Sequence, residues 1–427
     1  MLSKRSSLTI GHFPIIDHLI LGVAQYHDGA YFQHLELKTK EFSTWRTMSD
    51  ELRAGTIDGT FIPGPLAMEL IRNGFHGKIV LLGQREGQVF TVRNEITDVA
   101  MLKGKTVLIP DVFSTGHIFL DRILKSVGLD RAKDISIVSD YNPTTDITKI
   151  FHENKIQAFM SAEPRGTIVS EAGDGYIMKV SQGMQTHHIC CVLVMREDII
   201  EHTPDAMREL IESLVKAGMF INAYPHQAAD VGTDFMHVSK KIALTSLTHH
   251  KGHVLFWDLL PRVEDFQEIQ DAFIDELKVW KEPADVASML DASFAQQAYR
   301  AWMIDTRREV KDKGEARVLP GNFKEAVGRF VQACKDPVEV TGQCQVKAGQ
   351  RYPKADKEKG FVTFSPDSMK EPDLVVLRLS EQDAMRCMTA LGFGKHAHAD
   401  ILKPQDDGTY EIEYQAFKFL VLLLAYY

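Results

Sequence analysis

LKGKTVLIPDVFSTGHIFLDRILKSVGL, residues 102–129, contains the pattern that decides the fold. Its apolar run at 105–109 predicts a buried strand, and apolar residues at helical spacing predict a helix over 115–127. Gly128 is a typical helix stop. A strand, a short turn and a helix in this order are typical of an α/β protein with a largely parallel sheet.

The same alternation extends on both sides of this stretch. Before it we expect strands at 8–13, 35–42, 58–62, 78–83 and 88–93, with helices at 16–26, 46–54 and 65–74. After it we expect strands at 135–138, 156–160, 176–180 and 188–196, with helices at 145–154 and 164–172. The chain then becomes helical, over 204–223, 225–231, 234–244 and 264–280.

The two β/α stretches resemble each other at an offset of 99 residues. The matching pairs are Ile10 and Ile109, His18 and His117, Leu21 and Leu120, Ile57 and Ile156, Pro65 and Pro164, and Gly74 and Gly173. We therefore predict two equivalent lobes with a cleft between them. Ligands of open α/β sheets lie beyond the carboxyl ends of the strands, where helix N-termini favour an anion. The strands Val89–Val92 and Cys191–Met195 are expected to form the hinge.

These patterns divide the chain into three parts. Lobe 1 is predicted to be discontinuous, from 8–93 and 197–305, and lobe 2 to span 94–196. Residues 306–427 are predicted to be a linker and a small C-terminal α+β module of unknown role. Within it we expect a strand at 373–379, a helix at 380–391 and a strand at 409–414. The apolar end, 416–427, is expected to pack into this module or against a partner chain.

Four segments carry a family resemblance. They are 57–74, 102–129, 156–173 and 185–207, and they resemble the substrate-binding proteins of nitrate/sulfonate/taurine-type ABC transporters over residues 8–305. The resemblance implies a two-lobed type II periplasmic-binding-protein fold that binds a small anionic or zwitterionic metabolite, such as nitrate, bicarbonate or a sulfonate. The Thr115–Gly116–His117 turn and the Glu163–Pro164 pair resemble the nitrate and bicarbonate binders most.

Polar and aromatic residues at the predicted cleft are the candidate ligand contacts. Ser or Thr can cap the helix after residue 115, where free N–H groups hold an oxyanion. The equivalent histidines can face each other and donate to an anion, or they can be satisfied inside the fold. Glu163 either contacts a cation or pairs with Arg165. The candidates are Phe13, Pro14, Asp17, His18, Gly64, Pro65, Ser114, Thr115, Gly116, His117, Glu163, His187 and His188.

Cys190 and Cys191 follow the histidine pair on an expected strand. Neighbouring strand residues point to opposite faces, so Cys190 shares a face with His188 and Cys191 does not. A histidine and a cysteine can form a nucleophile and its base, but a buried return strand explains both thiols. We expect no metal and no cofactor; a metal between His18 and His117 would need Asp17 or Glu163 as a third ligand.

Charge and hydrophobicity limit the classes of partner that the protein can bind. The 427 residues carry 49 basic and 58 acidic side chains, a net charge of −9, which argues against a nucleic-acid partner. The longest apolar tract, 419–427, is too short to span a membrane. MLSKRSS at the N-terminus lacks a signal-peptide pattern, which predicts a cytoplasmic protein, or a periplasmic one if an export signal has been removed.

An ABC permease, or another chain contacting the C-terminal part, is the expected protein partner. The alternative function is a cytoplasmic enzyme on this scaffold, similar to a thiamin-pyrimidine synthase or a chorismate-dehydrating enzyme.

Overall fold

The chain divides into two compact units, Met1–Ala295 and Gln296–Tyr427. The computed structural model describes residues 5–139, 147–153, 155–181, 184–185, 188–248, 254–256, 258–302, 339–343, 361–363, 374–384, 402–407 and 409–415. Within these ranges, no helix combines the length and apolar character that crossing a membrane requires.

A five-stranded sheet forms the first lobe of the first unit. Its strand order is β2-β1-β3-β11-β4, with β1 (Ser6–His12), β2 (Leu35–Glu41), β3 (Gly59–Pro63), β4 (Gly77–Leu82) and β11 (Cys191–Arg196). Strand β1 is parallel to β2 and β3, whereas β11 runs antiparallel to both of its neighbours. Strand β3 is buried along its whole length, as expected for a central strand with apolar residues on both faces.

The second lobe repeats this sheet. Its order, read from the corresponding edge, is β8-β7-β9-β6-β10, with β6 (Gln88–Arg93), β7 (Thr106–Leu108), β8 (Ser136–Val138), β9 (Ala158–Ala162) and β10 (Gly175–Val180). Strand β6 is antiparallel to β9 and β10, as β11 is to β3 and β4. Strands β3 and β9 are offset by 99 residues, so the prediction of two equivalent halves is confirmed.

The fourth strand in each sheet order follows directly after the chain crosses from the other lobe. This strand is β11 in the first sheet and β6 in the second. We expected Val89–Val92 and Cys191–Met195 to be connecting strands, but they lie inside β6 of the second sheet and β11 of the first. The expected lobe boundaries after residues 93 and 196 therefore assign β6 to the first lobe and β11 to the second, whereas the sheets place each of them in the other lobe. The lobes are instead connected just before these strands. The two connections run alongside each other, because Arg85 forms an antiparallel bridge with Ile189.

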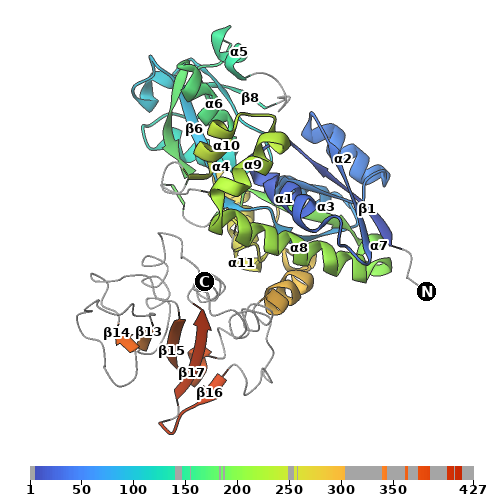
Figure 1. Ribbon diagram of the computed structural model, residues 1–427. Coiled ribbons are helices and arrows are strands. Elements are labelled where there is room, and N and C mark those ends of the chain that lie inside the picture. Colours follow the sequence, from blue (N-terminus) through green and yellow to red (C-terminus); the bar gives the residue numbers. More distant parts are fainter. Residues whose placement is uncertain are drawn as a thin grey trace. The chain divides into compact units, whose positions relative to one another are not determined.

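Helices cover both sheets (Figure 1). Those interleaved with the strands are α1 (Leu19–Asp28), α2 (Trp45–Ala54), α3 (Gly64–Arg72), α4 (Thr115–Lys125), α5 (Ile147–His152) and α6 (Arg165–Ala172), with the short 3₁₀ turns η1 (Ile16–His18) and η2 (Val99–Leu102). The later ones are α7 (Glu197–His202), α8 (Pro204–Ala223), α9 (Pro225–Met236), α10 (Lys240–Thr248) and α11 (Val263–Asp271), followed by a π turn (Ala272–Glu276) and η6 (Ala287–Met289). The core of the second lobe gathers around Phe90, Phe119 and Met160.

The second unit contains an antiparallel sheet of order β14-β13-β15-β17-β16. Its strands are β13 (Glu339–Gln343), β14 (Phe361–Thr363), β15 (Leu374–Ser380), β16 (Leu402–Pro404) and β17 (Thr409–Gln415). The strands predicted at 373–379 and 409–414 are confirmed, and residues 381–384 begin the predicted helix. The linker at 306–317 and the apolar end at 416–427 lie outside the described residues.

Arg85 anchors the first connection between the lobes. Its guanidinium is buried, and it contacts Asp258 at 2.8 Å and Asp265 at 2.7 Å, just before and within α11. The short strand β5 (Arg85–Glu86) also pairs with β12 (Val254–Leu255). The connection is therefore tied to the helical part of the first lobe by charge and by backbone hydrogen bonds.

Replacing Arg85 by Met should lower the free energy of unfolding by about 1.5–3 kcal/mol, because buried Asp258 and half-buried Asp265 lose one arginine partner and keep the other, Arg262. Urea denaturation followed by circular dichroism measures this change. The control is Arg208→Met, which removes an exposed ion pair with Asp205 and should change stability by less than about 1 kcal/mol. Equal losses in the two variants would contradict the role of Arg85.

Candidate functional site

Polar side chains from both lobes meet beside the two connections. The backbone N–H of Ile16, in the first lobe, donates to the carbonyl oxygen of Glu163 in the second, at 3.1 Å. Gln88 begins the second-lobe strand β6, and its Nε2 donates to Thr115 Oγ1 at 2.7 Å and to Cys190 Sγ at 3.1 Å. These contacts show that the lobes touch here. We call Asp17, His18, Gln84, Gln88, Cys190 and Cys191 the interlobe cluster.

Asp17 is fully buried in the interlobe cluster. Its Oδ2 accepts a hydrogen bond from the Cys190 thiol at 2.9 Å, whereas its Oδ1 has no hydrogen-bond partner among the described residues. Burial raises the pKa of Asp17 to about 6, and the nearby Cys190, Gln84 and Cys191 side chains oppose this rise. The carboxylate thus retains an unused acceptor in a water-poor setting.

His18 supplies a donor to the interlobe cluster. Its Nδ1 accepts the backbone N–H of Phe13 at 2.8 Å, so the proton of the neutral ring is assigned to Nε2. Burial lowers the pKa of His18 well below its ordinary value, and the charge of Arg165 adds to this effect. In the described part of the chain, Nε2 has no hydrogen-bond partner.

Two glutamines complete the polar set. Neither amide atom of Gln84 has a hydrogen-bond partner within the described ranges, and the same holds for Gln88 Oε1. Both side chains are buried. Sequence reasoning missed both residues, because they flank the charged pair Arg85–Glu86 between two apolar runs, a pattern that indicates an exposed turn. A polar side chain inside a buried strand is costly unless something pairs with it.

The two thiols lie together at the start of β11. Hydrogen bonding with Cys191 lowers the pKa of Cys190, but burial and the Asp17 carboxylate outweigh it and raise that pKa. Burial raises the pKa of Cys191 well above its ordinary value. Both groups are therefore protonated thiols at neutral pH, the form that is a poor nucleophile.

The structure places His117 differently from its repeat partner. Its Nδ1 donates to the carbonyl oxygen of Val112 at 2.9 Å, and its Nε2 accepts from Arg131 at 3.2 Å. His18 instead packs on Phe61, with ring centroids 5.4 Å apart. Both ring nitrogens of His117 are thus engaged within the second lobe, and we leave this residue out of the proposed site.

Two helix N-termini expected to hold an anion are capped by the protein itself. Ser114 Oγ accepts the backbone N–H of His117 at 3.3 Å at the start of α4. At α6, the Glu163 carboxylate accepts the N–H of Thr167 at 3.0 Å and its hydroxyl at 2.8 Å. Thr115 bonds to Gln88, and Gly116 packs so closely that a Cβ would lie 3.0 Å from Gln88 Oε1. These residues therefore support the interlobe cluster from the second lobe.

The remaining predicted contacts lie around the interlobe cluster. The Phe13 ring is buried, and its centroid lies 3.9 Å from that of Trp45. Pro14 is half-buried. The Gly64 N–H donates to the Cys190 carbonyl at 2.8 Å, next to buried Pro65.

Of the histidine pair, His188 is described and His187 lies outside the described residues. His188 is buried, and its Nδ1 donates to the carbonyl oxygen of Gln185 at 3.0 Å. Its ring packs edge-on against Phe119, with centroids 4.6 Å apart. These contacts fix the second connection against the core of the second lobe.

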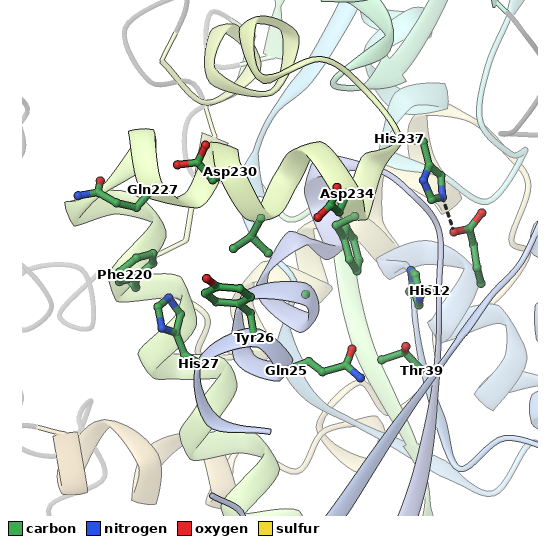
Figure 2. A pocket seen from close by; sticks show the side chains of 14 residues that line it. His12, Gln25, Tyr26, His27, Thr39, Phe220, Gln227, Asp230, Asp234 and His237 are labelled. Carbon is green, nitrogen blue, oxygen red and sulfur yellow. Dashed lines mark hydrogen bonds and ion pairs between the residues drawn. The ribbon is translucent and has the colours of Figure 1, made fainter. Parts of the chain in front are cut away.

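A separate pocket of about 900 Å³ opens on the first lobe, between α1, β2, α8 and α9. Figure 2 shows Tyr26, His27 and Phe220 grouped at one end of the pocket, and His12 and His237 at the other. Its lining includes polar groups that pair within the protein, such as His237 with Glu41 at 2.9 Å. This outer pocket contains none of the residues predicted from the sequence.

The family model of the NMT1-like family matches residues 3–233, which include both five-stranded sheets of the first unit. The chain belongs to the NMT1-like family. Among curated relatives of this NMT1-like chain, proteins of Brucella abortus and Brucella suis named "Putative binding protein" are 24% identical over 216 residues. The match covers 50% of this chain and 66% of each relative.

Solved structures share the fold. The ligand-binding component of an ABC-type import system from Staphylococcus aureus, solved with zinc bound, has a TM-score of 0.63 and 22% identity, covering 69% of this chain and 99% of that one. The periplasmic nitrate-binding protein NrtA from Synechocystis has a TM-score of 0.64 and 17% identity, covering 70% and 90%. The first unit of the NMT1-like chain is thus a two-lobed periplasmic-binding-protein fold.

The engaged ring of His117 gives a testable consequence. His117→Ala should lower the free energy of unfolding by about 1–3 kcal/mol, because the buried imidazole ring and its hydrogen bonds to the Val112 carbonyl and Arg131 are lost. The affinity for a solute between the lobes should change less than twofold. Urea denaturation and titration calorimetry measure the two effects, and His226→Ala, at an exposed position of α9, is the control. Unchanged stability together with lost affinity would return His117 to the site.

Proposed function

We propose that the first unit binds a small polar solute between its two lobes, as the solute-binding component of an ABC-type importer. The observation that carries this proposal is the interlobe cluster, in which five buried polar atoms lack a hydrogen-bond partner within the described residues. The names of the Brucella relatives and of the import-system structures support it. So does the family match over both sheets.

The unpaired atoms supply a driving force for binding. A buried donor or acceptor without a partner costs about 1–3 kcal/mol, and a solute that pairs with it recovers that cost. Asp17, His18 and Gln84 come from the first lobe and its exit, whereas Gln88 belongs to the second-lobe sheet. A solute that contacts both sides would favour the closed arrangement, because those contacts exist only when the lobes meet.

The chemistry of these atoms narrows the solute class. His18 Nε2 and Gln84 Nε2 are donors, and Asp17 Oδ1, Gln84 Oε1 and Gln88 Oε1 are acceptors. Nitrate only accepts hydrogen bonds, so it would leave three acceptors unpaired. A zwitterion with an ammonium group and an oxyanion pairs with both kinds of atom. Between the anionic and zwitterionic metabolites that the sequence allowed, the site favours the zwitterion.

A transport role also sets the expected compartment and partner. A periplasmic neighbour such as NrtA supports a location outside the cytoplasmic membrane. The partner would then be a membrane permease that receives the solute from the closed lobes. That the second unit contacts another protein chain remains a further part of this proposal.

A matched pair of solutes tests the proposed class. Taurine and ethanesulfonate differ in the ammonium group, and nitrate and bicarbonate carry none. We expect taurine, or another compact zwitterion found by native mass spectrometry of the purified chain, to raise the thermal midpoint. At 100 times the dissociation constant the stabilisation is about 2.7 kcal/mol. Stabilisation by nitrate or ethanesulfonate equal to that by the zwitterion would contradict the donor and acceptor argument.

Variants of the interlobe cluster test the place of binding. Asp17→Asn removes the charge that attracts an ammonium group, and Gln84→Leu removes a donor and an acceptor at similar size. Each should weaken binding of the zwitterion at least tenfold in titration calorimetry, which is about 1.4 kcal/mol. Asp50→Asn, an exposed position on α2, is the matched control and should bind as the parent does. Unchanged affinity in both cluster variants would place the solute elsewhere.

A further inference from the structure

Three side chains of the interlobe cluster converge with the donor atoms that a metal ion requires. One oxygen of Asp17 and the sulfur atoms of Cys190 and Cys191 all lie within 4.8 Å of one another. All three residues are buried. Among the described residues, no other group of three or more histidine, cysteine, aspartate or glutamate side chains has its potential ligand atoms this close together.

The thiols converge because of where β11 begins. Strand alternation predicted that adjacent cysteines point to opposite faces, but Cys191 is the first residue of β11, paired with Pro63 of β3, and Cys190 precedes it. Cys190 therefore lies outside the strand, and its side chain need not point to the face opposite that of Cys191. Its Sγ lies 2.9 Å from Asp17 Oδ2, and Asp17 belongs to η1, which follows β1 of the first sheet.

We propose that Asp17, Cys190 and Cys191 bind a thiophilic divalent cation of the Zn²⁺ type. Zn²⁺ prefers tetrahedral sites built from thiolate, imidazole and carboxylate ligands. Binding would release the thiol protons to solvent, since the thiolate is the ligand form. Two thiolates and one carboxylate provide three ligands and leave a fourth position open.

The surroundings favour thiolate ligands. Gln88 Nε2, from the second lobe, approaches Cys190 Sγ to 3.1 Å and can donate to a metal-bound thiolate. Asp17 Oδ1 is a second carboxylate oxygen with no partner among the described residues. His18 is not a ligand in this arrangement, because its Nδ1 accepts from Phe13 and its Nε2 carries the proton.

The open fourth position connects this site to the proposed function. An oxygen or nitrogen of the solute can occupy it, so that the metal would anchor the solute between the lobes. Only this last step rests on the proposed function. The three-ligand site itself follows from the geometry of the chain.

The full chain, treated with a chelator and dialysed, is titrated with Zn²⁺ alone against a chromophoric competitor. We expect one tightly bound ion per chain, and a Co²⁺ derivative with thiolate-to-metal charge-transfer absorption. Cys190→Ser and Cys191→Ser should each weaken binding at least 100-fold and remove that absorption. These variants conserve side-chain size, and circular dichroism checks that they fold. Cys387→Ser, which removes a thiol of the second unit, is the control and should bind as the parent does.

The outcomes separate the metal site from the proposed function. Absence of tight Zn²⁺ binding, or binding that survives both cluster serines, overturns the metal site. Solute binding measured in the chelated protein tests the transport proposal by itself. Zn²⁺ binding without any solute binding keeps the metal site and contradicts the proposed function. Solute affinity that is equal with and without Zn²⁺ removes the fourth-position role and keeps the three-ligand site.

Discussion

The exchange of one strand between the lobes is the constraint on which the rest of the structure depends. Strand β6 leaves the first lobe to complete the second sheet, and β11 returns to complete the first. Both connections must therefore pass the same point, and the buried ion pairs of Arg85 hold that point against the helices of the first lobe. Gln84 and Gln88 flank one connection and Cys190 ends the other. The crossing itself thus creates the polar interlobe cluster.

The interlobe cluster and the outer pocket differ in how their polar groups are satisfied. In the outer pocket, His237 pairs with Glu41 and Asp230 with Lys240, at an exposed surface where water serves any remaining group. In the interlobe cluster, Asp17 and Gln84 are buried and hold atoms that no described residue pairs with. An unpaired buried group costs free energy in the folded state, and a solute between the lobes can offset it. For this reason we place the proposed function at the interlobe cluster.

The sequence predicted the elements better than the contacts. Strand and helix positions in the first unit followed from apolar periodicity, and the 99-residue offset indicated the duplication because β3 and β9 are equivalent central strands. The strand exchange was missed, since nothing local shows which sheet a strand joins. The contact between Asp17 and Cys190 joins residues 173 positions apart, which periodicity cannot indicate. The 99-residue offset also suggested that His18 and His117 have the same role, which is wrong. His18 keeps a free donor, whereas Val112 and Arg131 pair with both ring nitrogens of His117. The burial of Gln84 and Gln88 could not be predicted either, because they flank the charged pair Arg85–Glu86, and such a polar segment usually forms an exposed turn.

The most direct measurement of the central claim is a crystal structure of the full chain with the solute that native mass spectrometry finds bound to it. We expect density for that solute between the lobes, within hydrogen-bond distance of Asp17 Oδ1 and of the Gln84 amide. Density in the outer pocket beside His12 and His237, or on the second unit, with the interlobe cluster packed as it is here, would show that the interlobe cluster is not the binding site.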